Sequence, residues 1–86
     1  MLEELLGQEV VVDLRSPYVC LGTLLRVGEQ FLELADADLH DLRDSPTNRE
    51  NYVAGVRRSG IIRNRRKLLL ARGEIIAVAR LEDVGG

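Results

Sequence analysis

The stretch that decides the fold is residues 66–83, with the sequence RKLLLARGEIIAVARLED. Two short apolar runs, residues 68–71 and 75–78, flank a charged break at residues 72–74, and β-branched residues gather in the second run. This pattern predicts a strand, a sharp corner and a second strand. Gly73 stands at the corner, where a residue without a Cβ can bend sharply or approach another backbone closely.

Length and composition predict one small domain spanning residues 1–86. The chain has 45% hydrophobic residues, but its only aromatic residues are one Phe and two Tyr, so Leu, Val and Ile must fill the core. A core of this size buries about two-thirds or less of the unfolded surface. Domains this small often gain stability from partner subunits.

Charge and cysteine usage exclude several classes of protein. The net charge of −2 argues against a surface devoted as a whole to nucleic acid, so any such contact must be local. Cys20 is the single cysteine of the chain, so it has no partner for an internal disulfide. No spacing of Cys and His residues suggests a zinc site. We therefore expect a reducing, cytoplasmic setting. We expect no signal peptide, because residues 1–7 are short and carry Glu3 and Glu4 instead of a basic start and an apolar run. We expect no membrane partner, because no apolar run approaches the roughly 18 residues of a spanning helix.

The first half of the chain alternates as strands do. Leu2, Leu5 and Leu6 have helical spacing and precede Gly7, which predicts a short N-terminal helix. Residues 9–15 then have period two and predict a strand. Its expected core face is Val10, Val12 and Leu14, and its expected outer face is Glu9, Val11, Asp13 and Arg15.

Two further strands follow, at residues 18–27 and 31–39. Gly22 interrupts the first of them and predicts a bend that lets the sheet curl. In the second, the apolar phase slips once around Ala35 and Asp36, which predicts a bulge. Asp36, Asp38 and His40 are expected to share the outer, solvated face.

Residues 45–66 predict an insertion of a different kind. Ser45 and Pro46 break the strand, and residues 47–50 form a capping box, with the Thr47 hydroxyl as the expected N-cap. The predicted helix has an apolar stripe of Tyr52, Val53 and Val56, and Gly60 is its expected C-cap. A basic connector, residues 63–67, leads into the last strand pair.

Four short segments resemble a known family. These are the helix ending in Leu6 and Gly7, the strand EVVVDL at residues 9–14, the GTL at residues 22–24, and Arg72 and Gly73 before a β-branched run. Together they are similar to the two signature segments of Sm and Sm-like proteins, over most of the chain except residues 44–66. The resemblance implies an SH3-like, strongly bent, five-stranded antiparallel barrel. It also implies rings formed by the last two strands, and RNA bound near the pore by two loops.

The loop at residues 28–32 departs from that family. In the family an Asp opens this loop and an Asn a few residues later contacts a base, and this chain has neither. Glu29 would repel phosphate, and Leu32 has no group that can hydrogen-bond a base edge. Arg72 and Gly73 remain from the second segment. Arg72 could stack on a base or meet a phosphate. Alternatively, it could simply pair with a carboxylate at the corner while Gly73 makes the turn.

Charge is strongly separated along the chain. Residues 29–44 hold six acids and one base, a sum of −5, whereas residues 57–67 hold six bases and no acid. Two interpretations follow. The basic connector could fix phosphates of a nucleic acid without reading sequence. Alternatively, it docks on the acidic third strand, within a subunit or between subunits, and sets the specificity of assembly.

Catalytic and metal sites are not expected. His40 lies beside Asp38 and Asp41 and could act as a base or metal ligand, but a single His on a polar strand face is usually solvated. Asp36 and Asp38 are too few oxygen ligands for a hard cation. Cys20 lies in an apolar strand and is expected to be inert. We predict no enzymatic activity, no cofactor, no metal and no small-molecule substrate.

The sequence thus predicts a non-catalytic Sm-like module that forms a homo-oligomeric ring. The expected pairing edge is Ile75, Ile76, Ala77, Val78 and Ala79, because an uncovered edge in a small domain invites another strand. RNA binding is the alternative function. The residues that would carry it are Arg63, Asn64, Arg65, Arg66, Lys67, Arg72 and Gly73.

Overall fold

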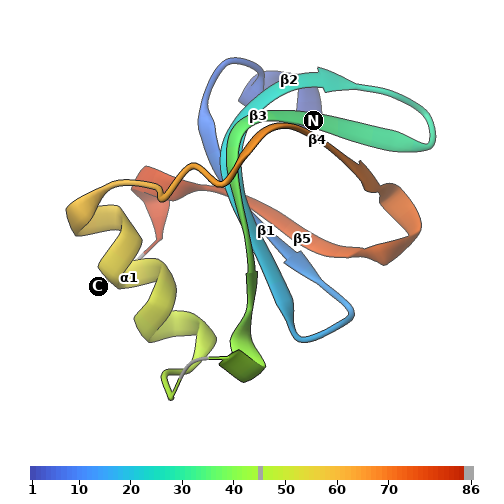
Figure 1. The fold of residues 1–86 in the computed structure, drawn as a ribbon. Helices are drawn as coiled ribbons and strands as arrows, with labels where there is room; N and C mark the ends of the chain where they lie inside the picture. The colour runs from blue at the N-terminus through green and yellow to red at the C-terminus, as the bar shows by residue number, and fades with distance from the viewer. Residues whose placement is uncertain (45, 85–86) are drawn as a thin grey trace.

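The computed structural model describes residues 1–44 and 46–84, so the predicted break at Ser45 lies outside them. Within these residues the chain forms five strands and one α-helix, and the helix lies outside the curled sheet (Figure 1). The strands are β1 (Glu9–Leu14), β2 (Tyr18–Val27), β3 (Phe31–Asp41), β4 (Arg65–Ala71) and β5 (Ile75–Arg80). The helix is α1 (Arg49–Ser59), and the short 3-10 turns are η1 (Leu2–Leu5), η2 (Leu42–Asp44), η3 (Arg72–Glu74) and η4 (Leu81–Asp83).

The strands form one antiparallel sheet in the order β4-β3-β2-β1-β5. The predicted five-stranded antiparallel sheet and the helix inserted between its third and fourth strands are therefore confirmed. The sheet curls, yet β4 and β5 do not pair with each other within the described residues (Figure 1). The sheet remains open, with one of these strands at each edge.

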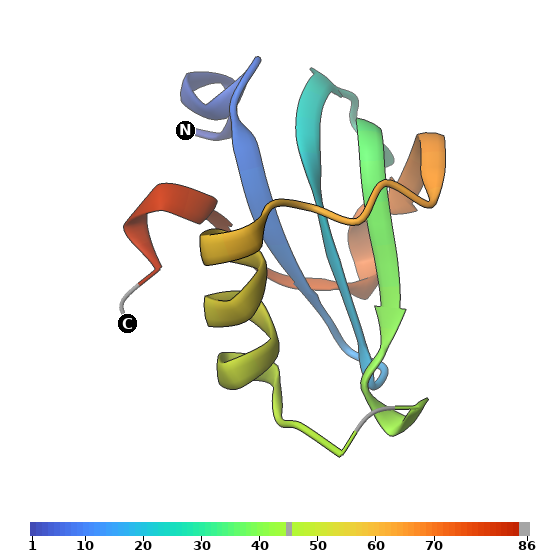
Figure 2. The same cartoon turned by 60° about the vertical axis from the view of Figure 1, so that its left-hand side comes forward.

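The sheet separates two apolar clusters. Inside the curl, Val10, Val12 and Leu14 pack as predicted against residues of β2, β3 and β4. On the other face, α1 packs against β1 and β2 (Figure 2) and buries Val11, which sequence reasoning had placed on a polar face. That prediction was wrong because β1 is covered on both sides, as its unbroken run of three valines permits.

A bulge lies where the apolar phase slips in β3. Leu21 is opposite Asp38 and Thr23 is opposite Ala35, so two residues of β3 face Gly22 alone. Asp36 has a positive φ of 49°. A Cβ on Gly22 would lie 2.9 Å from the Ala37 Cβ, so the close approach of these strands requires glycine. The predicted bend and the predicted bulge are thus the two sides of one feature.

Helix α1 ends as predicted but begins differently. Its N-cap is Asn48, whose side chain accepts a hydrogen bond of 2.8 Å from the Asn51 amide, so the prediction of Thr47 as N-cap was wrong by one residue. Asn at this position caps as well as Ser or Thr, and the sequence offers both. Gly60 is the C-cap, with φ 95°, and its amide donates to the Val56 carbonyl.

Three other expectations need correction. The N-terminal helix is the 3-10 turn η1, too short for two α-helical turns. Strand β4 begins at Arg65, so most of the basic connector belongs to a strand. At the corner, η3 makes the turn, and a Cβ on Gly73 would meet nothing within 4 Å. Since only Gly7 and Gly60 among the described glycines have positive φ, the corner does not require glycine.

Candidate interaction surfaces

The outer edge of β5 is apolar along most of its length. Ile75 and Val78 pack partly against the inner core, whereas Ile76 is 64% exposed and Ala77 and Ala79 are also exposed. Ile76 is the extra residue of a bulge, because Leu14 is opposite Ile75 and Asp13 is opposite Ala77. This strand carries no proline or acid, and its only charge is Arg80 at the end. The five residues predicted as a pairing edge therefore do lie at an edge.

The outer edge of β4 is the second open edge. It begins with three exposed basic residues and continues through three leucines. Leu70 is buried in the inner core and Leu68 packs against it, whereas Leu69 is 59% exposed on the other face. The two edges thus lie on opposite sides of the sheet and have different chemistry.

Glu33 connects the basic strand to the acidic one. It is buried beside β4, where its Oε2 lies 3.4 Å from the Lys67 Nζ and its Oε1 lies 2.7 Å from the Arg26 guanidinium. The hydrogen bond from Arg26 is the main cause that lowers the Glu33 pKa, with a smaller contribution from Lys67. Docking of the basic connector on the acidic third strand is therefore found within the subunit, at Lys67.

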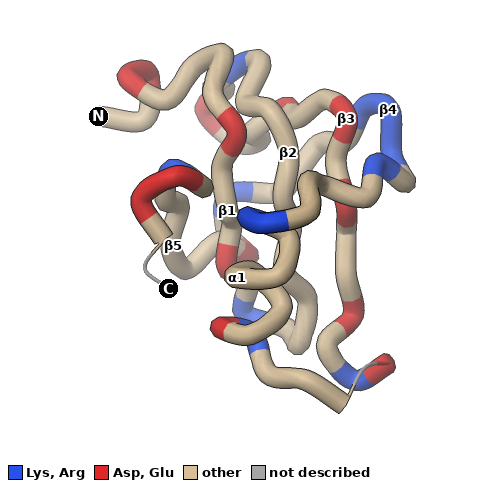
Figure 3. The backbone as a smooth tube through the Cα atoms, turned by 90° about the vertical axis from the view of Figure 1, so that its left-hand side faces the viewer, with Lys and Arg blue, Asp and Glu red and all other residues tan. Residues whose placement is uncertain are grey.

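The other four residues of the connector divide into two groups. The Asn64 side chain is structural, since its Nδ2 donates to the Asp38 Oδ1 at 2.7 Å and its Oδ1 accepts from the Leu39 amide at 3.3 Å. Arg65 donates to the Asn64 carbonyl. Arg63 and Arg66 are exposed and make no ion pair with any residue in 1–44 or 46–84 (Figure 3 shows the charged positions). Among the basic residues of the connector, Arg63 and Arg66 thus have no hydrogen bond or ion pair to the described residues, and Arg65 has only the bond to the neighbouring backbone carbonyl.

Arg72 holds the corner to the turn between β2 and β3. Its Nη1 donates to the Gly28 carbonyl at 2.7 Å, and its amide donates to the Gln30 carbonyl at 2.9 Å. The two loops that the Sm resemblance assigns to RNA therefore do come together. The arginine binds a backbone carbonyl there, instead of the carboxylate that sequence reasoning offered as its structural partner.

Phe31 is a residue that sequence reasoning missed. It is 45% exposed and lines a hollow of about 330 Å³ with Arg26, Glu33 and Leu69. A clue was present in the sequence, because Phe31 directly follows the turn at residues 28–30, where a strand has few neighbours.

A polar cluster joins α1 to β3. Asp38 is only 2% exposed, and its carboxylate accepts hydrogen bonds from Asn64 and from the Tyr52 hydroxyl. Burial, followed by the hydrogen bond to Asp38, raises the Tyr52 pKa. The His40 ring stacks on Tyr52 with centroids 3.8 Å apart and planes at 8°. The prediction of a solvated outer face is therefore wrong for Asp38 and His40, because Tyr52 of α1 covers them, whereas Asp36 is exposed in the bulge as predicted.

The predicted catalytic and metal candidates are not brought together as a site. Asp41 binds Arg43 through both oxygens, which lowers its pKa to about 2. Cys20 is fully buried, and burial, with the nearby Asp38 charge, raises its pKa to about 12. In the part of the chain that the structure describes, no group of three His, Cys, Asp or Glu side chains is placed to hold a metal ion. No described helix is long and apolar enough to cross a bilayer.

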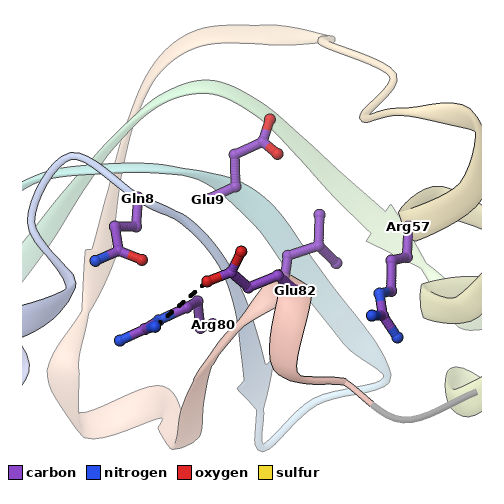
Figure 4. Close-up of a pocket in the computed structure, with 6 residues that line it drawn as sticks. Gln8, Glu9, Arg57, Arg80 and Glu82 are labelled. Carbon is purple, nitrogen blue, oxygen red and sulfur yellow. Dashed lines mark hydrogen bonds and ion pairs between the residues drawn. The ribbon is translucent and has the colours of Figure 1, made fainter.

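An open hollow of about 370 Å³ lies at the end of β5 (Figure 4). Its wall carries both signs of charge, with Glu9 and Glu82 against Arg57 and Arg80. Arg80 is held by Glu82, at 3.3 Å, and by Asp83, at 3.8 Å. Arg57 donates to the Val84 carbonyl. The arginines are thus already engaged, whereas the Glu82 and Asp83 side chains remain about two-thirds exposed.

Comparison with known proteins adds no assignment. Neither a protein-family model nor a curated protein matches the chain.

Proposed function

We propose that the protein is a non-catalytic module that assembles with copies of itself through the two open edges of its sheet. The observation that carries the proposal is the strand order, which leaves β4 at one edge and β5 at the other. Each edge strand offers one row of backbone amide and carbonyl groups with no strand beside it in the described residues.

The side chains of β5 favour such pairing. Natural proteins protect edge strands with lysine, proline, inward charges or a covering loop. The first five residues of β5 are Ile, Ile, Ala, Val and Ala, and Ile76 remains largely exposed. Among the described residues of this strand, the protection is limited to a bulge at Ile76 and the charge of Arg80 at its end. Burial against a second strand would remove this apolar surface from water.

The Sm-like resemblance implies that the last two strands pair between neighbours, so the proposed contact joins β4 of one copy to β5 of the next. A head-to-tail contact of this kind generates a closed ring if its rotation closes, and an open filament if it does not. With the Sm-like resemblance of the chain, the proposed assembly is a ring of curled, barrel-like subunits. A reducing cytoplasm suits the single buried thiol, Cys20.

The test is the mass of the purified protein in solution. Multi-angle light scattering after size exclusion is expected to give a discrete oligomer, and negative-stain electron microscopy a ring. A monomer at tens of micromolar protein would refute the proposal. Filaments alone would retain the edge contact and reject the ring.

RNA binding is the second candidate, and Arg63 and Arg66 are the observation in its favour. Both are exposed and have no ion-pair partner among the described residues, and exposed Phe31 could stack on a base. Asn64 and Arg72, by contrast, are committed to the fold. Fluorescence anisotropy with short U-rich and A-rich RNAs over a salt series tests this function.

The expected result is binding that weakens steeply with salt and is lost when Arg63 and Arg66 are changed to Ala. Arg58→Ala is the control, because Arg58 is exposed on α1, in another part of the surface. No binding at low salt would reject RNA as the ligand.

A further inference from the structure

Each of the two edge strands carries one large apolar side chain that the subunit leaves exposed. Leu69 of β4 is 59% exposed, and Ile76 of β5 is 64% exposed. Among the described residues, the other exposed large hydrophobic side chains lie outside β4 and β5. The edges that the proposed assembly brings together therefore each offer one apolar side chain to a partner.

Leu69 belongs to an apolar patch on the outer face of the sheet. Leu69 is opposite Glu33 in the β3–β4 ladder, and the next outward-facing pair is Phe31 and Ala71. Phe31 is 45% exposed and lines, with Leu69, the hollow of about 330 Å³. Ala71 is exposed and has only a methyl group, so it covers little of Phe31 on the side of the β4 edge. We call Phe31, Leu69 and Ala71 the β4 patch.

Ile76 projects from the other edge of the sheet. It is the extra residue of the β5 bulge, between Ile75, which is opposite Leu14, and Ala77, which is opposite Asp13. Ile75 packs against the inner core, whereas Ile76 belongs to neither apolar cluster. Ile76 is therefore turned away from the inner face. In a sheet that continues from one copy to the next, this is also the side of the β4 patch.

Antiparallel pairing places Ile76 beside this patch. When β4 of one copy runs against β5 of the next, the end of β4 lies beside the beginning of β5. Because β4 has seven residues and β5 has six, two alignments pair the whole of β5 with β4. Ile76 is level with Leu69 in one of them and with Leu70 in the other. Both alignments stay within the bounds of the two strands.

The second alignment also matches the faces of the two strands. It sets Leu68 level with Val78, and both of these side chains pack on the inner core. Ile76, turned outward by the bulge, then lies diagonally between Leu69 and Ala71. Diagonal neighbours on adjacent strands are within reach of long side chains.

Charge at the far end of this alignment is balanced. Arg66 is level there with Arg80, and like charges directly opposite are destabilising. Arg80 is already paired with Glu82, at 3.3 Å, and with Asp83, at 3.8 Å. These carboxylates reduce the repulsion that Arg66 meets.

We propose that Ile76 of one copy packs against the β4 patch of the next, and that this apolar contact sets which parts of the two edges meet. This inference rests on the proposed self-assembly and specifies the side chains that carry it. The occupant of the patch is a second copy, because this chain itself supplies an exposed apolar side chain at the matching end of the opposite edge. The contact removes both apolar surfaces from water.

Disulfide formation between two variants tests the contact. One variant carries Leu69→Cys and the other Ile76→Cys; they are mixed in urea with reductant, refolded together and then oxidised. A disulfide needs Cα atoms within about 7 Å of each other. The wild type under the same oxidation reports any reaction of buried Cys20. The matched control mixes Ile76→Cys with Ile62→Cys, because Ile62 is 67% exposed but lies outside both edge strands.

The expected product is a covalent dimer with one chain of each variant, and peptide mass spectrometry should show the bond between positions 69 and 76. Each variant alone and the control mixture should give much less dimer. Circular dichroism on each variant checks that the fold is retained.

Truncation of the two side chains gives an independent measure. Leu69→Ala and Ile76→Ala are each expected to weaken self-association by about fivefold in sedimentation velocity over a dilution series. The double variant should be weakened by less than the product of the two effects, because both truncations remove the same contact. Ile62→Ala is the control and should associate as the wild type does.

Failure of this contact differs from failure of the assembly. If the wild type assembles but the mixture of Leu69→Cys and Ile76→Cys gives no more dimer than the control, Ile76 does not meet the patch. A dimer that forms as readily from either variant alone shows that like edges meet, which also overturns the inference. Additive effects of the two truncations would place Leu69 and Ile76 in separate contacts. If the wild type is a monomer, the proposed function falls, and this inference falls with it.

Discussion

Replacing Ile76 by lysine should separate the assembly of this protein from its folding. Ile76 is 64% exposed, and as a bulge residue it has no partner on β1. A lysine there leaves the β1–β5 ladder intact. We therefore expect the free energy of unfolding of the subunit to change by no more than about 0.5 kcal/mol.

The effect on assembly should be much larger. Burying a whole isoleucine side chain contributes about 1.5–3 kcal/mol, so covering the exposed part of Ile76 contributes roughly 1–2 kcal/mol for each interface. Lysine loses that contribution and places a hydrated charge on the edge, which is a common natural protection against strand pairing. Because about 1.4 kcal/mol is a factor of ten, the association constant should fall by about tenfold or more.

The chain offers a close control in Ile62→Lys. Ile62 is 67% exposed and lies before β4, outside both edge strands. Sedimentation velocity gives the oligomer distribution of both variants, and urea unfolding monitored by circular dichroism gives the stability of the subunit. If Ile76→Lys assembles as the wild type does, or if Ile62→Lys weakens assembly equally, the assignment of β5 as the contact edge is wrong.

The other predictions concern the fold that supports this edge. Gly22→Ala should destabilise the subunit by roughly 1–3 kcal/mol in urea unfolding, because the new Cβ would overlap the facing strand. Gly73→Ala is the control and should be neutral or slightly stabilising. Equal effects of the two substitutions would contradict the structure. Tyr52→Phe should cost about 1.5–3 kcal/mol at neutral pH through the lost hydrogen bond to Asp38. The folded state raises the Tyr52 pKa above the unfolded value of about 10, so this stabilisation is present below pH 10 and is lost as the pH rises further. The stabilities of the two proteins should therefore converge in alkali. A difference that stays constant with pH would show that ionisation of Tyr52 is not coupled to folding. Cys20 should react with a thiol reagent only after unfolding, and fast labelling of the native protein at neutral pH would show that the thiol is accessible.

Local patterns predicted most elements of this fold. The second strand has the bounds expected from its apolar run, and the phase slip in β3 is a bulge opposite Gly22. Gly60 is the C-cap of α1 because a positive φ is strained for other residues. These features depend on residues close together in the chain. Capping was less certain, since Thr47 and Asn48 both suit an N-cap and adjacent residues compete for it.

The candidate surfaces were predicted less well, because each depends on contacts between distant segments. Arg72 has the expected position, but its partner is the Gly28 carbonyl, which lies 44 residues earlier. Asn64 was grouped with the basic residues, although its side chain binds Asp38. Exposure of Phe31 depends on where β4 ends beside the start of β3, with Ala71 opposite Phe31.

By itself, then, the sequence determined where the chain extends, turns and bulges, because backbone preference and apolar period act over a few residues. Only the tertiary structure decided which faces are covered. Helix α1 buries Val11 and Asp38 on the face that alternation alone assigns to solvent. The strand order places β4 and β5 at opposite edges, so the stretch at residues 66–83, adjacent in sequence, provides two different surfaces. Register and strand order arise from long-range pairing, which local periodicity does not encode.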